Sequence, residues 1–414
     1  MLRITSNHLA PLKTRDIPAL TNPHLPLNNN GSNPPSSASS NVPSPHVGIR
    51  VYSVLPTMSA NPPEPGFFTQ NELLSQPQVW QKTLGDLKSS ALLESLHEKT
   101  KSKTEWLFVA CGSSLYLGRT AASSWTFLTG LRARAIPASE LLLFPSADFL
   151  DLENTQAVMV SRSGTTSETV RAANLLSRDY KIPTLALTCT KPSALADACD
   201  LTLALPDANE ESMAMTRSFT SLLFAMQLLA ARRASNTEFP AKLEMLPAHF
   251  APQIHSLAAR MKTFVEQHSF ADYVFLGQGP YYGIASEGAL KVTEMSCSYA
   301  QVFHTLEFRH GPKTIVGPET CLTFFLSESG LQTESEVLEE MKELGATTIA
   351  VCNRSNDAIR RSSDLLFELG ADVPELTTLA PFLVPAQLLG YHTGIKKGLN
   401  PDHPKNLSHV VILD

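Results

Sequence analysis

Residues 157–164 read AVMVSRSG, and residues 322–330 read LTFFLSESG. In both stretches an apolar run ends in hydroxyl-bearing residues and a glycine, and a segment of helix length follows. A short apolar run of this kind is typical of a strand that is buried on both faces. Strand, loop and helix in this order indicate a parallel α/β arrangement, and their second appearance indicates an internal repeat.

The repeat extends to three further pairs of apolar runs. These are residues 106–111 with 273–278, 184–189 with 348–353, and 201–206 with 365–370, at offsets of 167, 164 and 164 residues. Near-constant offsets with helix-length spacers predict right-handed crossovers and one parallel sheet per copy. We therefore expect an α/β protein with two tandem, doubly wound parallel-sheet domains of the flavodoxin-like kind, with four buried strands each. The alternative is one large sheet in which the similarity is accidental.

The chain is expected to have four parts. They are a disordered or mis-assigned tail (1–65), a first domain with an N-terminal helix (66–235), a second domain (236–385) and a C-terminal tail that contributes to the site (386–414). The first part holds 12 of the 29 prolines and lacks the apolar core of a secretory signal. A start at Met58 and an organellar transit peptide are both open for it.

Composition excludes several classes of protein. The formal net charge of -6 over 414 residues argues against nucleic acid or an anionic membrane as partner. No apolar run is long enough to span a membrane. Six cysteines without a CxxC pair suggest neither a zinc site nor a disulfide framework, and they suit the cytoplasm. We expect no metal and no cofactor.

Hydroxyl groups crowd the loop that follows the second strand of the first copy. Ser161, Ser163 and Thr166 surround Gly164 directly before a predicted helix. A helix N-terminus offers unpaired N–H groups, and each hydrogen bond to a charged oxygen is worth roughly 1.5–3 kcal/mol. The loop therefore predicts a site for a phosphomonoester, although a cluster of helix caps is the alternative. In the second copy Gln332 replaces Thr166, so its phosphate capacity is expected to be eroded.

A second loop follows the first strand of the same copy. Gly112 permits a close backbone approach, and Ser113 and Ser114 supply two further hydroxyls at the same sheet edge. Neither the GxGxxG pattern nor a P-loop is present. The two loops together predict a cradle for a sugar phosphate.

Five ordered motifs carry a resemblance to a known family. They are CGSS (111–114), SRSGTTSET (161–169), ESMAMTRSFT (211–220), EGALKVTEMS (287–296) and LEFRHGP (306–312). Together they resemble the tandem sugar isomerase (SIS) domain family. Its relatives include the isomerase half of glutamine–fructose-6-phosphate aminotransferase and stand-alone galactosamine- or glucosamine-6-phosphate deaminase/isomerase proteins. The resemblance covers about residues 80 to 414.

The resemblance implies roles for individual positions. The implied phosphate and sugar contacts are Ser161, Ser163 and Thr166, with Gly112, Ser113 and Ser114, and a pocket carboxylate at Glu210. Glu294 matches the base that moves a proton between C1 and C2, and Lys291 lies on the same helix. His310 matches the histidine of ring opening, which in relatives comes from the neighbouring subunit. The partners implied are a small-molecule sugar phosphate and a second copy of the chain, in a homodimer with a shared site.

Spacing supports the helical part of this constellation independently. Glu287, Lys291 and Glu294 are four and three residues apart, so they lie on one face of a helix. The alternative is a surface ion pair with a spare acid. His310 lies in a loop where an imidazole suits proton transfer near neutral pH, although a structural role is the alternative.

The C-terminus departs from the family pattern. His409 stands where the aminotransferase carries a Schiff-base lysine, and an imidazole cannot form an imine. Lys405, four residues earlier, is expected to act only as a charge, and an ordinary polar tail is the alternative for both residues. Nothing before residue 80 resembles a glutamine-hydrolysing domain.

We therefore expect an enzyme that converts a hexosamine-6-phosphate into a ketose-6-phosphate and ammonia. The alternatives are an aldose–ketose isomerase acting on a non-amino sugar phosphate of the tagatose-6-phosphate type and a non-catalytic sugar-phosphate sensor.

Overall fold

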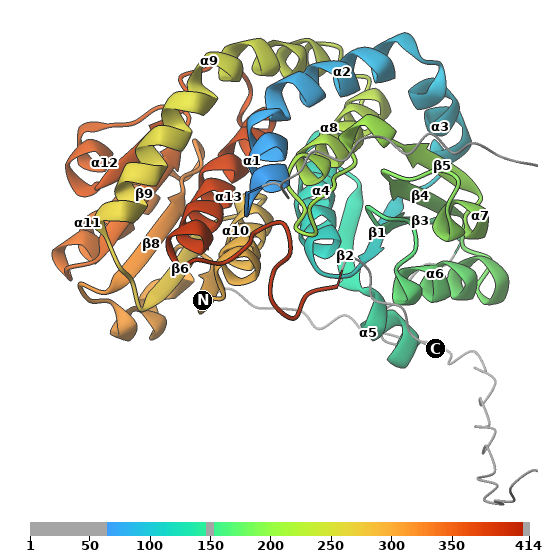
Figure 1. The fold of residues 1–414 in the computed structure, drawn as a ribbon. Coiled ribbons are helices and arrows are strands. Elements are labelled where there is room, and N and C mark those ends of the chain that lie inside the picture. Colours follow the sequence, from blue (N-terminus) through green and yellow to red (C-terminus); the bar gives the residue numbers. More distant parts are fainter. Residues whose placement is uncertain (1–63, 146–152, 409–414) are drawn as a thin grey trace, which may run out of the picture. The chain divides into compact units, whose positions relative to one another are not determined.

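In the part of the chain that the structure describes, ten strands form two sheets in which every pairing is parallel (Figure 1). The first sheet contains β1 (Glu105–Ala110), β2 (Arg132–Pro137), β3 (Thr155–Val160), β4 (Thr184–Thr188) and β5 (Leu201–Ala204). The second contains β6 (Asp272–Gly277), β7 (Ala300–Phe303), β8 (Thr320–Phe325), β9 (Thr347–Cys352) and β10 (Leu365–Glu368). Their orders, β2-β1-β3-β4-β5 and β10-β9-β8-β6-β7, are the same flavodoxin-like order when each copy is numbered by itself. The predicted fold class is confirmed.

The computed structural model describes residues 64–145 and 153–408, which all lie in one compact unit of the chain. The expected tail of residues 1–65 falls almost entirely outside them.

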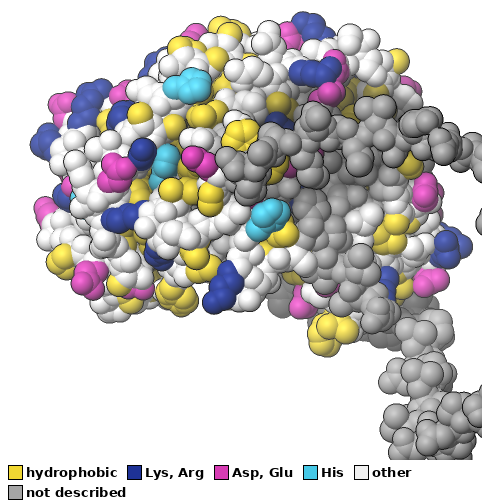
Figure 2. Space-filling view, viewed as in Figure 1, with side chains coloured by type: hydrophobic (Ala, Val, Ile, Leu, Met, Phe, Trp, Pro, Cys, Tyr) yellow, Lys and Arg dark blue, Asp and Glu magenta, His cyan; other side chains and the backbone are white. Residues whose placement is uncertain are grey.

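Within the described residues no helix is both long and apolar enough to cross a membrane. On the face in Figure 2, acidic and basic side chains are interspersed.

Helices surround both sheets. From residue 64 onward, where the description begins, three precede β1: α1 (Phe67–Leu74), α2 (Gln76–Ser89) and α3 (Leu92–Thr100). The first domain adds α4 (Ser113–Thr129), α5 (Ala138–Leu143), α6 (Ser167–Asn174), α7 (Ala194–Ala198) and α8 (Arg217–Arg233). The second has α9 (Glu238–Gln267), α10 (Tyr281–Ser296), α11 (Leu331–Glu343), α12 (Asp357–Ser362) and α13 (Leu379–Lys396). Short helical turns are η2 (Leu175–Asp179), η3 (Pro206–Ala208), η4 (Glu307–Arg309), η5 (Pro312–Ile315) and η6 (Glu375–Thr378).

The expected four strands per copy are one too few, because each sheet has five. The additional strands, β2 and β7, lie at sheet edges. Strand β2 reads RARAIP and leaves its arginines accessible, while β7 is only half-buried along its length. In these two edge strands accessible or half-buried positions replace a continuous apolar run, so the pattern that revealed the other strands is absent from them.

Of the predicted strands, the inner ones are buried on both faces as expected, but β5 and β10 lie at sheet edges and are only partly buried. Phe108 of β1 and Phe275 of β6 belong to one central core, which α2, α4, α8, α9, α10 and α13 complete. On the outer faces, Val109 packs with α5, α6 and α7, and Leu276 packs with α11 and α12. The two domains therefore share their largest core.

Helix α13 lies directly against α10 at the centre of the fold (Figure 1). Gly390 and Gly394 make the approach possible, because a Cβ there would lie 2.7 Å from the Lys291 carbonyl oxygen and 2.2 Å from that of Met295. The expected boundary between residues 385 and 386 falls inside this continuous helix. The segment after it therefore begins beyond Lys396.

Candidate active site

Two loops leave the first sheet at its topological switch point. Strands β1 and β3 are neighbours, and their last residues, Ala110 and Val160, are register partners. From β1 the chain proceeds to β2 on one side, and from β3 to β4 on the other. Ligands of doubly wound sheets bind outside the carboxyl ends of the strands at this point. The strand-one loop (residues 111–114) and the hydroxyl loop (residues 161–166) both begin here.

The hydroxyl loop brings its three predicted side chains together. The Ser161 Oγ lies 3.0 Å from the Thr166 Oγ1 and 3.5 Å from the Ser163 Oγ. Thr166 is the N-cap residue of α6, yet its side chain does not cap that helix. Gly164 has a φ of +66°, and a Cβ there would lie 2.3 Å from the Ser193 Oγ, so glycine is required. The grouped hydroxyls at a helix N-terminus suit the oxygens of a phosphate group.

The strand-one loop turns the chain from β1 into α4. Gly112 makes the turn with a φ of +55°, a conformation that glycine adopts without strain. Ser113 and Ser114 begin the helix and are both buried. The Ser114 Oγ faces the Met215 sulfur at 3.7 Å.

Helix α10 carries Glu287, Lys291 and Glu294 on one face, as their spacing predicted. Lys291 is completely buried, and its Nζ lies 3.4 Å from the Glu287 Oε1 and in hydrogen-bonding contact with Glu294. The same Nζ donates a hydrogen bond of 3.0 Å to the Ser113 Oγ. A side chain of the second domain thus reaches the strand-one loop of the first.

Burial and charge act in opposite directions on this cluster. Burial raises the pKa of Glu287 to about 8, although the Lys291 charge opposes that rise. Burial alone would lower the pKa of Lys291, but the two carboxylates outweigh it and raise that pKa overall. Glu294 is the most accessible of the three, with 16% of its side chain exposed. A carboxylate that is accessible and held beside an ammonium group suits proton transfer to and from a ligand.

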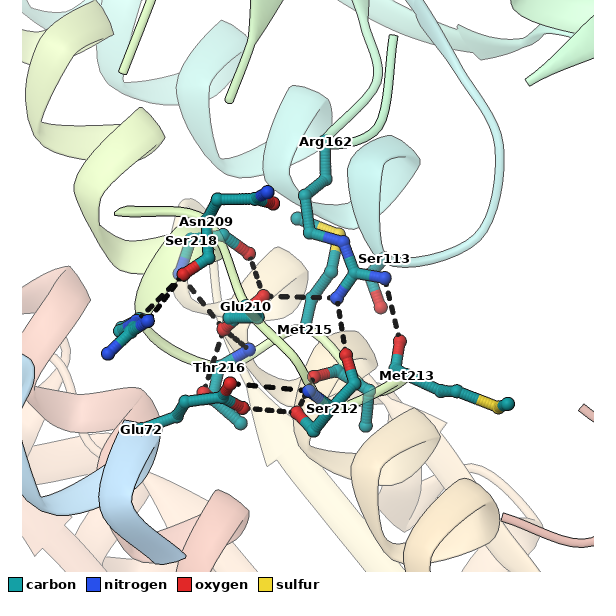
Figure 3. Close-up of polar contacts among 12 residues, drawn as sticks. Glu72, Ser113, Arg162, Asn209, Glu210, Ser212, Met213, Met215, Thr216 and Ser218 are labelled. Carbon is teal, nitrogen blue, oxygen red and sulfur yellow. Dashed lines mark hydrogen bonds and ion pairs between the residues drawn. The ribbon is translucent and has the colours of Figure 1, made fainter. Parts of the chain in front are cut away.

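Glu210 is placed differently from the expected pocket carboxylate. It lies in the linking segment (residues 209–216), which joins η3 to α8 (Figure 3). Its Oε1 accepts hydrogen bonds from the N–H and hydroxyl of Thr216 at 2.6 and 2.8 Å and from the Ser218 N–H at 3.1 Å. Its Oε2 accepts from Arg162, at 3.1 Å, and from the Ser218 hydroxyl. The carboxylate is therefore saturated by the protein and buried, so the geometry does not support direct contact with substrate.

Two further residues belong to this network, Arg162 and Glu72, and neither was predicted from the sequence. Arg162 lies between Ser161 and Ser163 of the hydroxyl loop, but its side chain points to the linking segment. There its charge is neutralised by Glu210 (Figure 3). Glu72 approaches that segment from α1. The position of Arg162, a basic residue inside a loop predicted to bind an anion, could have identified it from the sequence. No feature of the sequence near Glu72 indicates its role.

The two predicted histidines are not brought to this site by the described residues. His310 follows η4, is exposed, and its side chain forms no hydrogen bond or ion pair within residues 64–145 and 153–408. His409 lies outside the described residues. Across the described chain, no three His, Cys, Asp or Glu side chains are grouped as metal ligands.

The counterpart of the hydroxyl loop in the second domain is filled by carboxylates. The Glu334 side chain accepts hydrogen bonds from the N–H and hydroxyl of Ser327, at 2.9 and 2.8 Å. The Glu375 side chain accepts from the N–H of Glu328, at 2.8 Å, and from the N–H and hydroxyl of Ser329. Donors that could face an anion are therefore already used within the chain.

Comparison with known families assigns this arrangement. A profile of the SIS domain matches residues 100–232 and again residues 271–392. The chain belongs to the SIS domain family. Its two SIS repeats coincide with the two sheets, and the resemblance seen in the sequence motifs is confirmed.

Individual relatives agree with that assignment. A glutamine–fructose-6-phosphate aminotransferase of Methanothermobacter thermautotrophicus is 27% identical over 317 residues, which are 74% of this SIS protein and 51% of the relative. The chain thus spans about half the length of that curated relative. A crystal structure of glucosamine-6-phosphate deaminase from Thermotoga maritima is 30% identical, covers 83% of this chain and 99% of its own, and has a TM-score of 0.68. Tagatose-6-phosphate ketose/aldose isomerase from Escherichia coli shares the fold, with 24% identity, coverage of 83% and 98%, and a TM-score of 0.72.

Proposed function

We propose that this SIS protein is an amino-sugar phosphate deaminase/isomerase, which converts a hexosamine-6-phosphate and water into a ketose-6-phosphate and ammonia. The contact between Lys291 of α10 and Ser113 of the strand-one loop carries the proposal, because it joins the acid–base face to the sugar-facing loop. The match to a glucosamine-6-phosphate deaminase over 99% of that chain supports the choice of reaction. Related sugar-phosphate isomerases and deaminases support an enzyme of this class.

In the proposed mechanism the two loops bind the substrate. Ser161, Ser163 and Thr166 hold the phosphate group, and the strand-one loop holds the sugar. The open-chain sugar then places C1 and C2 beside Glu294. Glu294 removes the proton from C2 and returns it to C1, while the Lys291 ammonium stabilises negative charge that develops on the C1 oxygen. A second proton passes from the C2 nitrogen to the C1 oxygen, which leaves a C2 imine and a C1 hydroxyl, and addition of water to the imine releases ammonia and the ketose.

Ring opening needs a further proton donor and acceptor. We assign it to His310 of a second copy, because the His310 side chain is exposed and the described residues of its own chain give it no partner. The proposal therefore includes a homodimer with a shared site. An imidazole is suited to this step because its ordinary pKa lies near neutral pH.

Incubation with glucosamine-6-phosphate and galactosamine-6-phosphate tests the proposal. Ammonia and ketose-6-phosphate are expected in equal amounts from at least one epimer. No ammonia from either would reject deamination. Ketose formation from a non-amino aldose phosphate would instead indicate a simple isomerase, and binding without turnover would indicate a sensor.

A further inference from the structure

We propose that helix α1 contributes to the active site through Glu72, a positioning residue that holds the linking segment against the hydroxyl loop. Helix α1 (Phe67–Leu74) lies outside both stretches that match the SIS domain. The proposal rests on the proposed function, since it concerns the same site.

Glu72 binds the linking segment from one side. Its Oε1 accepts hydrogen bonds from the N–H groups of Glu211 and Ser212, at 2.6 and 3.2 Å, and its Oε2 accepts from the Ser212 hydroxyl (Figure 3). The Glu72 residue is 2% exposed. A buried carboxylate with these donors fixes the backbone of the segment at two consecutive residues.

Arg162 binds the same segment from the other side. It donates hydrogen bonds to the carbonyl oxygens of Ser212 and Met213, at 3.2 and 3.0 Å, in addition to its ion pair with Glu210. Ser212 is therefore held at its N–H and hydroxyl by α1 and at its carbonyl by the hydroxyl loop. Hydrogen bonds therefore connect α1 through Ser212 to Arg162, which the backbone places between the predicted phosphate contacts Ser161 and Ser163.

The segment after α13 holds α1 in place. The Asp402 carboxylate accepts hydrogen bonds from the N–H and hydroxyl of Thr69, both at 2.8 Å, and the Asn400 side chain accepts from the Gly66 N–H at 2.9 Å. The Asp402 carbonyl also accepts from the Met213 N–H at 3.1 Å. The linking segment, α1 and this later segment thus form one hydrogen-bonded unit.

Charge makes this unit sensitive to pH. Burial and the Glu210 charge raise the pKa of Glu72 to about 7, against the effect of its hydrogen bonds from Ser212 and Glu211. Other charged groups lie on or beside the same segments: Arg162, which pairs with Glu210, Arg217, which donates to the Ser75 hydroxyl, Asp402, which accepts from Thr69, and Glu64, whose carbonyl accepts from the Phe67 N–H. Protonation of Glu72 removes its negative charge. One of its oxygens then becomes a donor, so one of the hydrogen bonds that the carboxylate accepts would have to change direction. The hold on the linking segment should therefore tighten as pH rises through about 7.

Two variants of Glu72 test the proposal. Glu72→Ala should raise KM for the sugar phosphate about tenfold or more, with kcat within about threefold, because hydrogen bonds to a charged group are lost. Glu72→Gln should give a smaller rise in KM. The KM of the wild type should increase as pH falls from 8 to 6, and that of Glu72→Gln should not. Hydrogen–deuterium exchange of a peptide containing Glu211 and Ser212 should be faster in Glu72→Ala. Glu98→Gln removes an exposed carboxylate of α3 and is the matched control, expected to change none of these quantities.

The exchange measurement needs no substrate, so it separates this proposal from the proposed function. If the wild type turned over no sugar phosphate, the proposed function would fail, and exchange would still report on the Glu72 contact. Unchanged exchange in Glu72→Ala would overturn the proposal, as would faster exchange with an unchanged KM. If Glu72→Ala fails to fold, Ser212→Ala removes the hydroxyl contact with Glu72, together with the 3.2 Å contact of that hydroxyl with the Ala214 carbonyl, and keeps both N–H contacts with Glu72. Its KM effect should then be non-additive with that of Glu72→Gln, and additive effects would overturn the proposal.

Discussion

Lys291 is shared by two carboxylates, and this decides how the site is charged. One ammonium group cannot neutralise both Glu287 and Glu294 inside the protein. Burial raises the pKa of the fully buried Glu287 to about 8, so it retains a proton at neutral pH. The more accessible Glu294 is left as the partner of Lys291. Two glutamates on one helix face thus acquire different roles from their surroundings.

Glu294→Gln should lower kcat by roughly 10²-fold or more, because an amide cannot carry the proton between C2 and C1. KM should change little, since the side chain keeps its size and can still accept a hydrogen bond from Lys291. Steady-state kinetics on the substrate identified by ammonia release measure both constants. Glu336→Gln, at an exposed glutamate of α11, is the control. Turnover near that of the wild type would reject Glu294 as the base.

Glu287 should also affect how stability depends on pH. The pKa of Glu287 in the folded state, about 8, lies above its ordinary value of 4.5. Between these two pH values the folded state keeps a proton on Glu287 that the unfolded state has lost. This group therefore lowers stability as pH rises from about 5 to 8. Glu287→Gln removes that dependence, so the Tm of the variant minus that of the wild type should increase over this range. Calorimetry at pH 5.5, 7 and 8.5 measures it, and a constant difference would contradict the assignment.

At the scale of elements, the hydroxyl loop of the first domain and its counterpart in the second domain differ in the side chains that they hold. In the first copy the hydroxyls of Ser161, Ser163 and Thr166 face one another. In the second, Glu334 and Glu375 accept the corresponding hydrogen bonds from within the chain. The expectation that the second loop is eroded agrees with this geometry. Only the first loop retains donors for a phosphate group.

Ser163→Ala and Ser329→Ala form a matched pair at equivalent positions of the two loops. Loss of the Ser163 hydroxyl should raise KM by about tenfold, the value of one hydrogen bond to a charged oxygen, with little change in kcat. Ser329→Ala should leave KM unchanged and lower Tm slightly, because its hydroxyl serves Glu375. Equal KM values for Ser163→Ala and the wild type would reject the hydroxyl loop as the phosphate site.

The sequence predicted those elements whose signal is local. Inner strands were found because burial on both faces leaves an uninterrupted apolar run, and the α10 cluster because its spacing alone places it on one face. Edge strands β2 and β7 were missed because their exposed positions interrupt the pattern. The contacts of Glu210 could not be predicted because its partners Arg162, Thr216 and Ser218 become neighbours only after folding.

At the scale of the whole molecule, one chain does not complete the proposed site. Lys291 and Glu294 meet the strand-one loop within a single chain. His310 is exposed, and within the described residues its side chain forms no hydrogen bond or ion pair with them. A closed twofold dimer would place the same surface of each chain at the other's site, so each site could receive His310 from the partner subunit.

A shared site can be tested by complementation between inactive chains. Glu294→Gln and His310→Asn should each be nearly inactive as homodimers. In a heterodimer of the two, purified through different tags, one site combines the intact Glu294 of one chain with the intact His310 of the other, and the second site lacks both. Activity should therefore return to about half that of the wild-type dimer.

The control for this experiment pairs Glu294→Gln with Lys291→Met. Because both residues belong to the same helix and therefore to the same site, every site in that heterodimer lacks one of them, and no activity should return. Recovery in the first heterodimer but not in the second is the pattern that only a site built across two subunits produces. If neither heterodimer exceeded its parents, His310 would have to act within its own chain, and the exposed position of its side chain would then require a movement of the loop after η4.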